Sequence, residues 1–443
     1  MEVRVVSKEL IKPSSPAIQH KKPYKLCLLD QLTPSTYSPV IFFYPMEPSY
    51  SAIALSRLKS SLSETLNIYY PFSGRLNDNL YIDRFNEGVP FFEATINCRM
   101  SDFLKHHEIL SLNLLLPLQP FSKAADTNIP ILEIQVTVFT CGGIALTVCA
   151  SHKLVDGPTG RAFLNTMCCV SRGNVKDIIY PNLSEASQFF PPTTSLPKKH
   201  ISLMKSLWFT EGNYITRRFV FDAKAIANLR ANTQGKLETR PTRIETLSCF
   251  IWKCCMAASK AVSSSPKPSI LVEAVNLRPQ TNPPMSFTSI GNIYWWATAV
   301  AHPTATNIEL HELIKLLSEG TALYRGDFTQ TLQGEGGHET MSEHCDQLEE
   351  LFSLESPDIF AFTSWCYLGF TKTNFGWGEP YWFAFLGKVS PAFRNFTMFI
   401  ETKDGKGIEA WITLDQQRMA ILENDPEFLA FASPNPRISS SSL

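Results

Sequence analysis

The sequence predicts an α/β protein built from two domains. A chain of 443 residues is too long to bury only one hydrophobic core. Strand-like apolar runs alternate with segments of helical periodicity in both halves. Between residues 181 and 197 the composition shifts to Pro, Ser, Thr and Asn, which is typical of a linker. We therefore expect an N-terminal domain at 1–190, a crossover linker at 191–215 and a C-terminal domain at 216–443.

In the first half, apolar and β-branched runs predict strands, and leucine spacing predicts helices. Strands are expected at 2–7, 40–45, 80–84, 89–96, 131–139 and 144–149. Helices are expected at 51–66, 101–107 and 160–170, the first of which has Leu or Ile at positions 53, 55, 58, 62 and 66. Gly142 and Gly143 separate the last two strands and predict a hairpin.

In the second half, capping residues mark two helices. Asp222 precedes a helix at 223–232, and Thr242 with Glu245 forms a capping-box pattern before a helix at 243–259. Further helices are expected at 307–323 and 416–422, and strands at 217–221, 270–277 and 407–413. Little periodicity is left in 198–213, the segment 330–337 is a polar loop, and the tail 433–443 is expected to be disordered.

Composition and charge exclude several classes of protein. The net charge is −1, and no basic cluster is interleaved with aromatic residues, so we expect no nucleic-acid partner. No apolar window is long enough to span a bilayer, and residues 1–13 lack the apolar core of a signal peptide. The eleven cysteines include no Cys-x-x-Cys pair, so neither a zinc site nor a redox dithiol is indicated. We expect a cytoplasmic protein with reduced, mostly buried thiols and no bound metal.

The stretch Ala150-Ser151-His152-Lys153-Leu154-Val155-Asp156-Gly157 is the best candidate for chemistry. The strand at 144–149 places His152 at its C-terminal end, where a general base could face a cavity. Taken alone, the pattern is weak, because most histidines at strand ends have only a structural role. A metal hydrolase would need a third ligand near His152, and a serine hydrolase would need a Gly-x-Ser-x-Gly turn, which is absent. Glycine-rich phosphate loops are absent as well.

Four motifs together are more specific. They are His152-x-x-x-Asp156-Gly157, Asn276-Leu277-Arg278, Gly291-Asn292 and Asn374-Phe375-Gly376-Trp377-Gly378. This set resembles the plant BAHD acyltransferases, which transfer an acyl group from coenzyme A to an alcohol or amine. The resemblance runs from Ile11-Lys12-Pro13 to Phe428-Leu429. The segment Phe362-Thr363-Ser364-Trp365-Cys366 is most similar to the branch of alkaloid O-acetyltransferases that contains vinorine synthase.

The resemblance implies two chloramphenicol-acetyltransferase-like domains joined by a crossover loop, with a solvent channel between them. It implies that His152 acts as general base and then as acid in direct transfer, and that Thr363 and Trp365 position the intermediate. No cofactor would be held permanently; acyl-CoA, most simply acetyl-CoA, is the cosubstrate. Aromatic residues at 294–296 and 381–383 suit a polycyclic alkaloid or terpenoid alcohol as acceptor. A malonyl donor would need a cation such as Arg394, and a phenolic acceptor remains an alternative.

Other motif residues are expected to be structural. The resemblance implies that Asp156 pairs with an arginine and shapes the turn at Gly157. It implies that Gly376, Trp377 and Gly378 stabilise the architecture, and that Asn292 borders the channel. The family has Asp where this chain has Asn374, and that position is expected to pair with Arg278. Because Asn carries no charge, either water or a carboxylate such as Glu273 or Glu379 would then neutralise the arginine, or the pair would be weakened. The Asn374 substitution also leaves open a catalytically silent binding protein. We expect a monomer.

Overall fold

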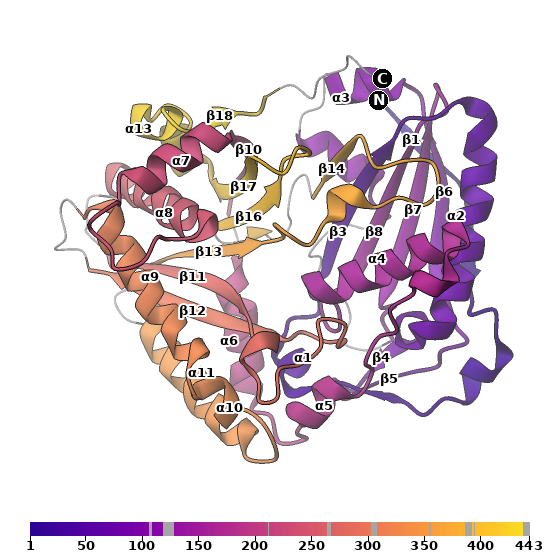
Figure 1. Cartoon of the computed structure of the whole chain (residues 1–443), viewed down its shortest axis with the longest axis horizontal. Coiled ribbons are helices and arrows are strands. Elements are labelled where there is room, and N and C mark those ends of the chain that lie inside the picture. The colour runs from indigo at the N-terminus through magenta and orange to yellow at the C-terminus, as the bar shows by residue number, and fades with distance from the viewer. Residues whose placement is uncertain are drawn as a thin grey trace.

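The computed structural model describes residues 1–105, 109–117, 128–210, 212–263, 267–302, 308–353, 356–385, 392–393 and 395–436. Two mixed β-sheets with helices packed against them dominate the chain (Figure 1). The first sheet is drawn mostly in indigo and magenta, and the second in red, orange and yellow. The predicted α/β class, with a mixed sheet and helices in each half, is confirmed.

The first sheet has six strands in the order β1-β6-β7-β8-β3-β14. Their bounds are β1 Val3–Ile11, β6 Val89–Ile96, β7 Leu132–Phe139, β8 Ile144–Ser151, β3 Tyr37–Tyr44 and β14 Trp382–Ala384. Only β6 and β7 pair in parallel. The hairpin between β7 and β8 turns at Gly142, whose φ is +90°. A side chain there would collide with the backbone of Pro48, so glycine is required.

Two long helices, α2 Pro48–Ile68 and α4 Gly157–Arg172, pack against each other and share a hydrophobic core with the first sheet. Helix α4 begins three residues earlier than the leucine spacing predicts. It starts there because the Asp156 side chain accepts a hydrogen bond from the Thr159 backbone N–H at 2.9 Å. This N-cap sets the direction in which the chain leaves β8, and so it helps to place His152.

The second sheet has seven strands in the order β12-β11-β13-β16-β17-β10-β18. Their bounds are β12 Tyr294–Ala301, β11 Ser269–Asn276, β13 Asp358–Ser364, β16 Phe396–Glu401, β17 Ile408–Asp415, β10 Tyr214–Phe221 and β18 Ser433–Pro434. Helices α8 Arg243–Val262 and α9 Leu310–Arg325 cover the side that faces away from the first sheet (Figure 1). The predicted N-cap at Asp222 and the capping box of Thr242 and Glu245 are both present.

Smaller elements fill the remaining space. The strands β2 Tyr24–Lys25, β4 Arg75–Asn77 and β5 Tyr81–Asp83 form a small sheet, and β9 Phe209–Thr210 pairs with β15 Ala392–Phe393. The other helices are α1 Leu28–Leu32, α3 Met100–Lys105, α5 Glu185–Phe189, α6 Lys198–Trp208, α7 Ala223–Ala231, α10 Phe328–Thr331, α11 Gly337–Ser353, α12 Gln416–Leu422 and α13 Pro426–Leu429.

Two of the longer helices, α6 and α11, were not predicted. Helix α6 lies inside the expected linker, where the fully buried His200 bonds Asp346 of α11 at 2.8 Å. Helix α11 follows the expected loop at 330–337 and buries Met341, Cys345 and Leu348 on one face. The many charged residues between these apolar positions obscure the helical period in the sequence. The linker is therefore structured, and packing between α6 and α11 supplies the order that local propensity does not.

The two halves of the chain interlock through β14. This strand belongs to the second half but pairs antiparallel with β3 of the first sheet. The ring of Trp382 stacks on Phe43 of the first sheet at 5.4 Å and on Trp411 of the second at 6.1 Å between centroids. The division into 1–190, 191–215 and 216–443 stays a proposal, with the addition that one strand of the second part completes the first sheet.

Part of the expected disordered tail is ordered. Ser433 and Pro434 pair with β10, and the Arg218 guanidinium donates to the Pro436 carbonyl at 3.2 Å. The predicted disorder of 433–443 is therefore wrong for the first four residues, because backbone pairing with β10 fixes them. The rest of the tail, 437–443, lies outside the described residues.

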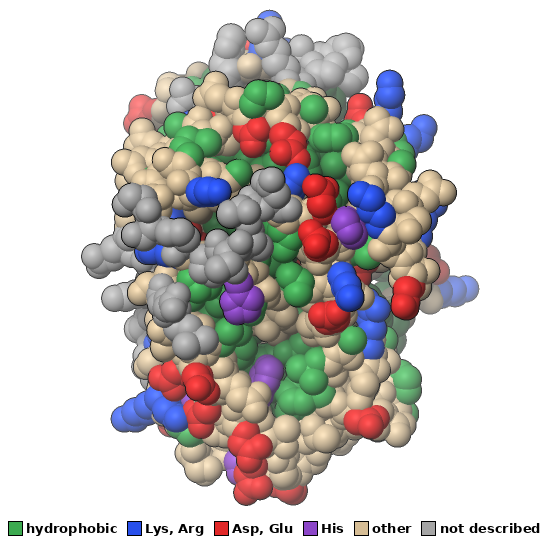
Figure 2. Space-filling model, turned by 90° about the vertical axis from the view of Figure 1, so that its left-hand side faces the viewer, with side chains coloured by type: hydrophobic (Ala, Val, Ile, Leu, Met, Phe, Trp, Pro, Cys, Tyr) green, Lys and Arg blue, Asp and Glu red, His purple; other side chains and the backbone are tan. Residues whose placement is uncertain are grey.

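Acidic and basic side chains are mixed on the face shown in Figure 2, and hydrophobic side chains gather in a hollow near its middle. A surface of mixed sign offers no continuous basic stripe on this face for a polyanion. Among the described residues, no helix is both long and apolar enough to cross a bilayer. All eleven cysteines are free thiols, and only Cys98 and Cys141 are partly exposed.

Candidate active site

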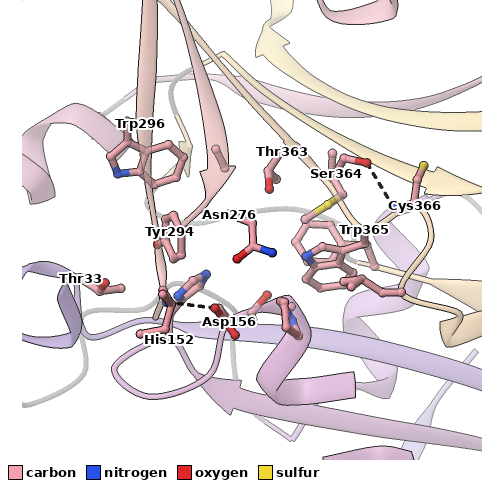
Figure 3. Close-up of a pocket in the computed structure, with 18 of the residues that line it drawn as sticks. Thr33, His152, Asp156, Asn276, Tyr294, Trp296, Thr363, Ser364, Trp365 and Cys366 are labelled. Atoms are coloured by element: carbon pink, nitrogen blue, oxygen red, sulfur yellow. Dashed lines mark hydrogen bonds between the residues drawn. The ribbon is translucent and has the colours of Figure 1, made fainter. Parts of the chain in front are cut away.

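A cavity of about 310 Å³ lies between the two halves of the chain, and His152 is on its wall (Figure 3). The first half contributes residues from the α1–β3 connection and from the turn after β8. The second half contributes the ends of β11, β12 and β13. Most of the wall is apolar or aromatic, and the residues used below are Thr36, His152, Asp156, Gly157, Asn276, Arg278, Tyr294, Trp296, Thr363 and Trp365. A cavity of this kind suits a small organic molecule held by a few polar groups.

His152 follows the last residue of β8, as the strand pattern predicts. Its backbone N–H donates to the Thr36 carbonyl at 2.7 Å, which fixes the turn. Enclosure by the cavity walls lowers the pKa of the imidazole below its ordinary value of 6.5, and the nearby Asp156 carboxylate partly opposes this. The ring is therefore neutral at pH 7, which is the state that a general base needs.

Asn292 determines which ring nitrogen of His152 is free. The Asn292 Nδ2 group donates to the His152 carbonyl at 2.7 Å and to Asp30 Oδ1 at 2.9 Å. Because both Nδ2 hydrogens are used, the amide oxygen must be the atom that faces the ring. It lies 3.0 Å from His152 Nδ1, so Nδ1 carries the proton. In the neutral ring this leaves the Nε2 lone pair available as a base.

The Asp156 carboxylate is engaged elsewhere. It forms two bonds with Arg278, 2.7 Å to Nη1 and 3.1 Å to Nη2, and both side chains are almost fully buried. It also accepts the backbone N–H groups of Thr159 and Ile293. These four donors hold the carboxylate in the turn, and Arg278 is the arginine partner expected for Asp156. Gly157 follows directly, and a side chain there would meet Leu368 and Trp365.

Thr363 and Trp365 lie at the end of β13, on the cavity wall opposite His152 (Figure 3). The structure thus brings together His152, the expected base, and both residues expected to position the intermediate. Asn276, at the end of β11, points into the same space between them (Figure 3). Its amide oxygen accepts the Arg278 backbone N–H at 3.2 Å, which leaves its Nδ2 group as a further donor toward the cavity.

The expected pairing of Asn374 with Arg278 is wrong. Asn374 lies in the loop after β13, where its Oδ1 accepts the backbone N–H groups of Gly376 at 2.8 Å and Gly378 at 3.1 Å. Its backbone carbonyl accepts from Arg172 at the end of α4. Arg278 is instead neutralised by Asp156, so neither Glu273 nor Glu379 is needed. Trp377 packs edge-on against Tyr44 of β3 at 6.0 Å, so this loop fastens the second half to the first sheet.

Only part of the aromatic density faces the cavity. Tyr294 and Trp296 line it, and the Tyr294 ring lies edge-on to His152 at 5.8 Å between centroids. Trp295 points into a hydrophobic core, and Trp382 and Phe383 pack in the core beside the first sheet. The alternation along β12 explains the difference, because successive side chains of a strand face opposite ways. Arg394, named for a malonyl donor, lies outside the described residues.

A second, smaller cavity of about 50 Å³ adjoins His152 on its other side, between the first sheet and α4. It shares Ser38, His152, Asp156, Gly157 and Trp365 with the main cavity. The rest of its wall is apolar or glycine: Val40, Phe72, Leu132, Val148, Ala150, Val155, Gly160, Phe163, Leu164 and Phe370. The two cavities therefore meet at the imidazole. No cluster of three or more potential metal ligands occurs in the described part of the chain.

Two residues of this site were not assigned a role from the sequence. Asp30 lies in a Leu-Asp-Gln stretch that is far in sequence from the four motifs. Asn276 lies two residues before Arg278, and only the arginine of that motif was expected to have a role. A buried carboxylate inside a short apolar helix such as α1 is unusual without partners, and this is the signal that could have singled out Asp30.

Comparison with known proteins identifies the family. The model of the Transferase family matches residues 1–429. The chain is 37% identical to akuammiline synthase 2 of Alstonia scholaris, covering 99% of this chain and 98% of that protein. It is 36% identical to a limonoid 7-O-acetyltransferase of Citrus sinensis, covering 98% and 99%. The crystal structure of vinorine synthase superposes with a TM-score of 0.81 at 31% identity, covering 98% and 99%. The chain therefore belongs to the Transferase family, as its resemblance to the BAHD acyltransferases predicts, and it is an acyl-CoA-dependent O-acyltransferase.

Proposed function

We propose that this enzyme transfers an acetyl group from acetyl-CoA to a hydroxyl group of a polycyclic alkaloid or terpenoid, with His152 as the general base. The observation that carries the proposal is the His152–Asn292 pair. It holds the proton on Nδ1 and leaves Nε2 free in a cavity that both halves of the chain line. Because burial lowers the pKa of the imidazole, the ring is neutral at pH 7 and can accept a proton.

In this mechanism, Nε2 takes the proton of the acceptor hydroxyl while the acceptor oxygen attacks the thioester carbon. The carbonyl oxygen becomes an oxyanion and needs preorganised donors. The Thr363 hydroxyl, the Trp365 indole N–H and the Asn276 amide lie on the facing wall and are the candidates. When the carbon–sulfur bond breaks, the imidazolium returns its proton to the thiolate of CoA. The transfer is direct and needs no nucleophile from the protein.

The small cavity supports a short, uncharged acyl group. Its volume of about 50 Å³ leaves room for roughly four non-hydrogen atoms. Among the described residues of its wall, only Asp156 is charged, and it is already paired with Arg278. A malonyl carboxylate would be buried there without a cation, which is costly. Acetyl and other short aliphatic groups therefore suit this space better than malonyl.

The main cavity supports a large, mostly apolar acceptor. Tyr294, Trp296 and Trp365 offer flat apolar faces around His152, and ring systems pack well on such faces. The relatives also favour this choice, since one is named as an akuammiline synthase and another as an acetyltransferase for a limonoid. A terpenoid or phenolic acceptor with another donor is the alternative within the same class. We also propose that the enzyme acts as a monomer in the cytoplasm.

The test is an acceptor screen. The purified protein is incubated with acetyl-CoA and a panel of polycyclic alkaloid, terpenoid and phenolic alcohols, while released thiol and acetylated product are followed. Turnover with an alkaloid or terpenoid alcohol is expected, with malonyl-CoA slower by at least tenfold. If acetyl-CoA binds but neither thiol nor product forms with any acceptor, the protein is a silent relative that binds without transfer.

A further inference from the structure

The Asp30 carboxylate lies at the centre of a buried network beside the active site. Asp30 is completely buried in α1, where its Oδ2 accepts the Cys27 backbone N–H at 2.9 Å. Its Oδ1 accepts two donors from one residue, the Asn292 backbone N–H at 2.7 Å and Asn292 Nδ2 at 2.9 Å. Helix α1 is thereby connected to the segment that precedes β12, across the boundary between the two halves of the chain.

The segment before β12 is held by hydrogen bonds on two sides. Gly291 has a φ of +133°, and a side chain there would lie 3.4 Å from the Asp30 carboxylate. Its carbonyl accepts Arg278 Nη2 at 3.0 Å, while Ile293 N–H donates to Asp156. The peptide before β12 is therefore held on one side by the Asp156–Arg278 pair and on the other by Asp30. Asn292 sits between them and has little freedom to move.

An ionised carboxylate can only accept hydrogen bonds, so it requires a donor from its neighbour. Asp30 Oδ1 faces the side-chain amide of Asn292, and it therefore requires the Nδ2 end of that amide. The opposite end, Oδ1, is then fixed toward His152 Nδ1. Two acceptors therefore set the amide orientation that determines the imidazole tautomer: the His152 carbonyl, and Asp30 Oδ1, which lies behind Asn292 as seen from the ring.

We propose that Asp30 is a positioning residue for acyl transfer: it fixes the Asn292 amide so that His152 presents an unprotonated Nε2 to the acceptor. The inference rests on the proposed function of His152. Asp30 touches neither substrate, and its role is to select one of the two neutral tautomers. An Asn in its place could donate as well as accept, so that the His152 carbonyl would be left as the acceptor that holds the Nδ2 end. The Asn292 amide could then turn over and place the proton on Nε2.

Protonation of Asp30 itself would have the same effect, and several groups face it. Burial raises the pKa of this carboxyl to about 6, whereas the N–H donors of Asn292 and Cys27 lower it. The Cys27 thiol and the Tyr24 and Tyr294 hydroxyls lie close to it. The Lys153 ammonium bonds the Asp30 carbonyl at 3.1 Å. Acyl transfer should therefore fall at mildly acidic pH through two groups, His152 and Asp30.

The experiment combines a mutant cycle with a direct measurement of the tautomer. The variants are D30N, N292A and the double variant, each assayed for kcat and KM with acetyl-CoA and an acceptor from the screen. We expect D30N to lower kcat at least 100-fold with KM for acetyl-CoA changed less than threefold. Because Asp30 acts through Asn292, adding D30N to N292A should change kcat by less than threefold. Nitrogen-15 NMR of labelled histidine should show His152 protonated at Nδ1 in the parent and at Nε2 in D30N.

The matched control is C27A. Cys27 caps α1 through its thiol, which accepts the Asp30 backbone N–H at 3.4 Å, and no hydrogen bond among the described residues joins it to Asn292. This variant should keep kcat within threefold, which separates loss of the helix cap from loss of the Asn292 contact. If D30N does not fold, the His152 tautomer is measured in N292A. This variant lacks the amide oxygen, so its imidazole should lose the preference for a proton on Nδ1.

The outcomes distinguish this inference from the proposed function. An unchanged His152 tautomer in D30N or in N292A overturns the role of Asp30, even if the parent transfers acetyl groups. The role of Asp30 is also overturned if D30N lowers kcat by the same factor in the N292A background as in the parent. A parent that shows the Nδ1 tautomer, switched in D30N, but transfers no acyl group refutes the proposed function and leaves the network intact.

Discussion

His152 and Asn292 hold each other through two contacts: Nδ1 of the ring lies 3.0 Å from the amide oxygen, and the amide Nδ2 donates to the His152 carbonyl at 2.7 Å. One residue follows β8 of the first sheet and the other precedes β12 of the second. The same pair therefore orients the candidate base and joins the two walls of the cavity. A shift of one sheet against the other would therefore change the position of the His152 ring.

The first prediction concerns His152. The H152A variant should lose about 10²–10⁴-fold in kcat, because it lacks a positioned proton acceptor. Its circular dichroism and affinity for acetyl-CoA should remain close to the parent. In the parent, kcat/KM should fall below the pKa of His152, which burial holds under 6.5. A variant that keeps most of its transfer rate would exclude His152 as the base.

The sequence was sufficient for the frame of the molecule and for the position of His152. The strand that ends at His152, the hairpin at Gly142 and the cap at Thr242 all rest on interactions within a few residues, and local patterns record such interactions well. The four motifs, through their resemblance to the family, extended the prediction to the two-sheet architecture. The catalytic role of His152 itself stays a prediction until the variant is measured.

What the sequence did not reveal depends on contacts between distant segments. Asp30 and Asn292 are 262 positions apart, and nothing local indicates that they meet. Asn374, Glu273 and Glu379 were the side chains expected near Arg278. Only the fold shows that Asp156 pairs with it, while Asn374 bonds the backbone of its own loop. Strand β14 is three residues long and is ordered by its pairing with β3, so periodicity could not locate it.

The second prediction concerns the buried pair of Asp156 and Arg278. In D156A the guanidinium loses two bonds from a site where both side chains are less than 5% exposed. Removing one partner of a buried pair costs about 3–5 kcal/mol. D156A should therefore unfold at lower denaturant concentration and yield less soluble protein. The measurement is the free energy of unfolding, with D156N as the variant of matched shape. If D156A unfolds like the parent, Asp156 acts on substrate rather than on the fold.

The third prediction follows from the Asp30 carboxyl, whose pKa is raised from 3.8 to about 6 by burial. Between these values the folded protein holds a proton that the unfolded chain has released. The stabilisation from this group is complete below pH 3.8 and is lost as the pH rises through about 6. The difference between a pKa of 3.8 and one of about 6 corresponds to about 3 kcal/mol of stability. The unfolding free energy of the parent relative to D30N should fall by that order between pH 4 and 7.

Because other buried carboxyls titrate in both proteins, the difference between parent and D30N isolates Asp30. A difference that stays constant across this pH range would mean that the carboxyl titrates alike in the folded and unfolded states. If the stabilisation is lost as expected, D30N should be as stable as the parent at neutral pH, or more stable, while transferring acyl groups poorly. That combination is expected of a residue kept for activity and not for stability.

The fourth prediction tests the small cavity as the space for the acyl chain. Gly160 of α4 is on its wall, and an added methyl group would meet only Val155, at an ordinary contact of 3.4 Å. G160A should therefore fold, keep acetyl transfer within about threefold, and lose roughly tenfold with butyryl-CoA. The control is G326A at the end of α9, where a methyl group also fits. Equal losses with both donors would show that the cavity is only a packing void.

The last prediction concerns Asn374, where the family has Asp. The Asn374 Oδ1 accepts two backbone N–H groups of its own loop, and Asp would accept the same two with a charge. Hydrogen bonds to a charged acceptor are worth about 1.5–3 kcal/mol against about 1 for neutral ones, and partial exposure reduces the gain. Arg172 donates to the Asn374 carbonyl, so a cation is already close.

N374D should therefore raise the unfolding free energy by about 1 kcal/mol, and the gain should shrink in high salt. The control N374A loses both bonds and should be destabilised. Turnover of N374D should stay within a few-fold of the parent, because this loop contacts the end of α4 at Ser171 and Arg172 and not His152. Melting curves at low and high salt, with kcat measured alongside, decide the matter. If N374D loses most of its activity while becoming more stable, the end of α4 must transmit strain from this loop to the turn at Asp156.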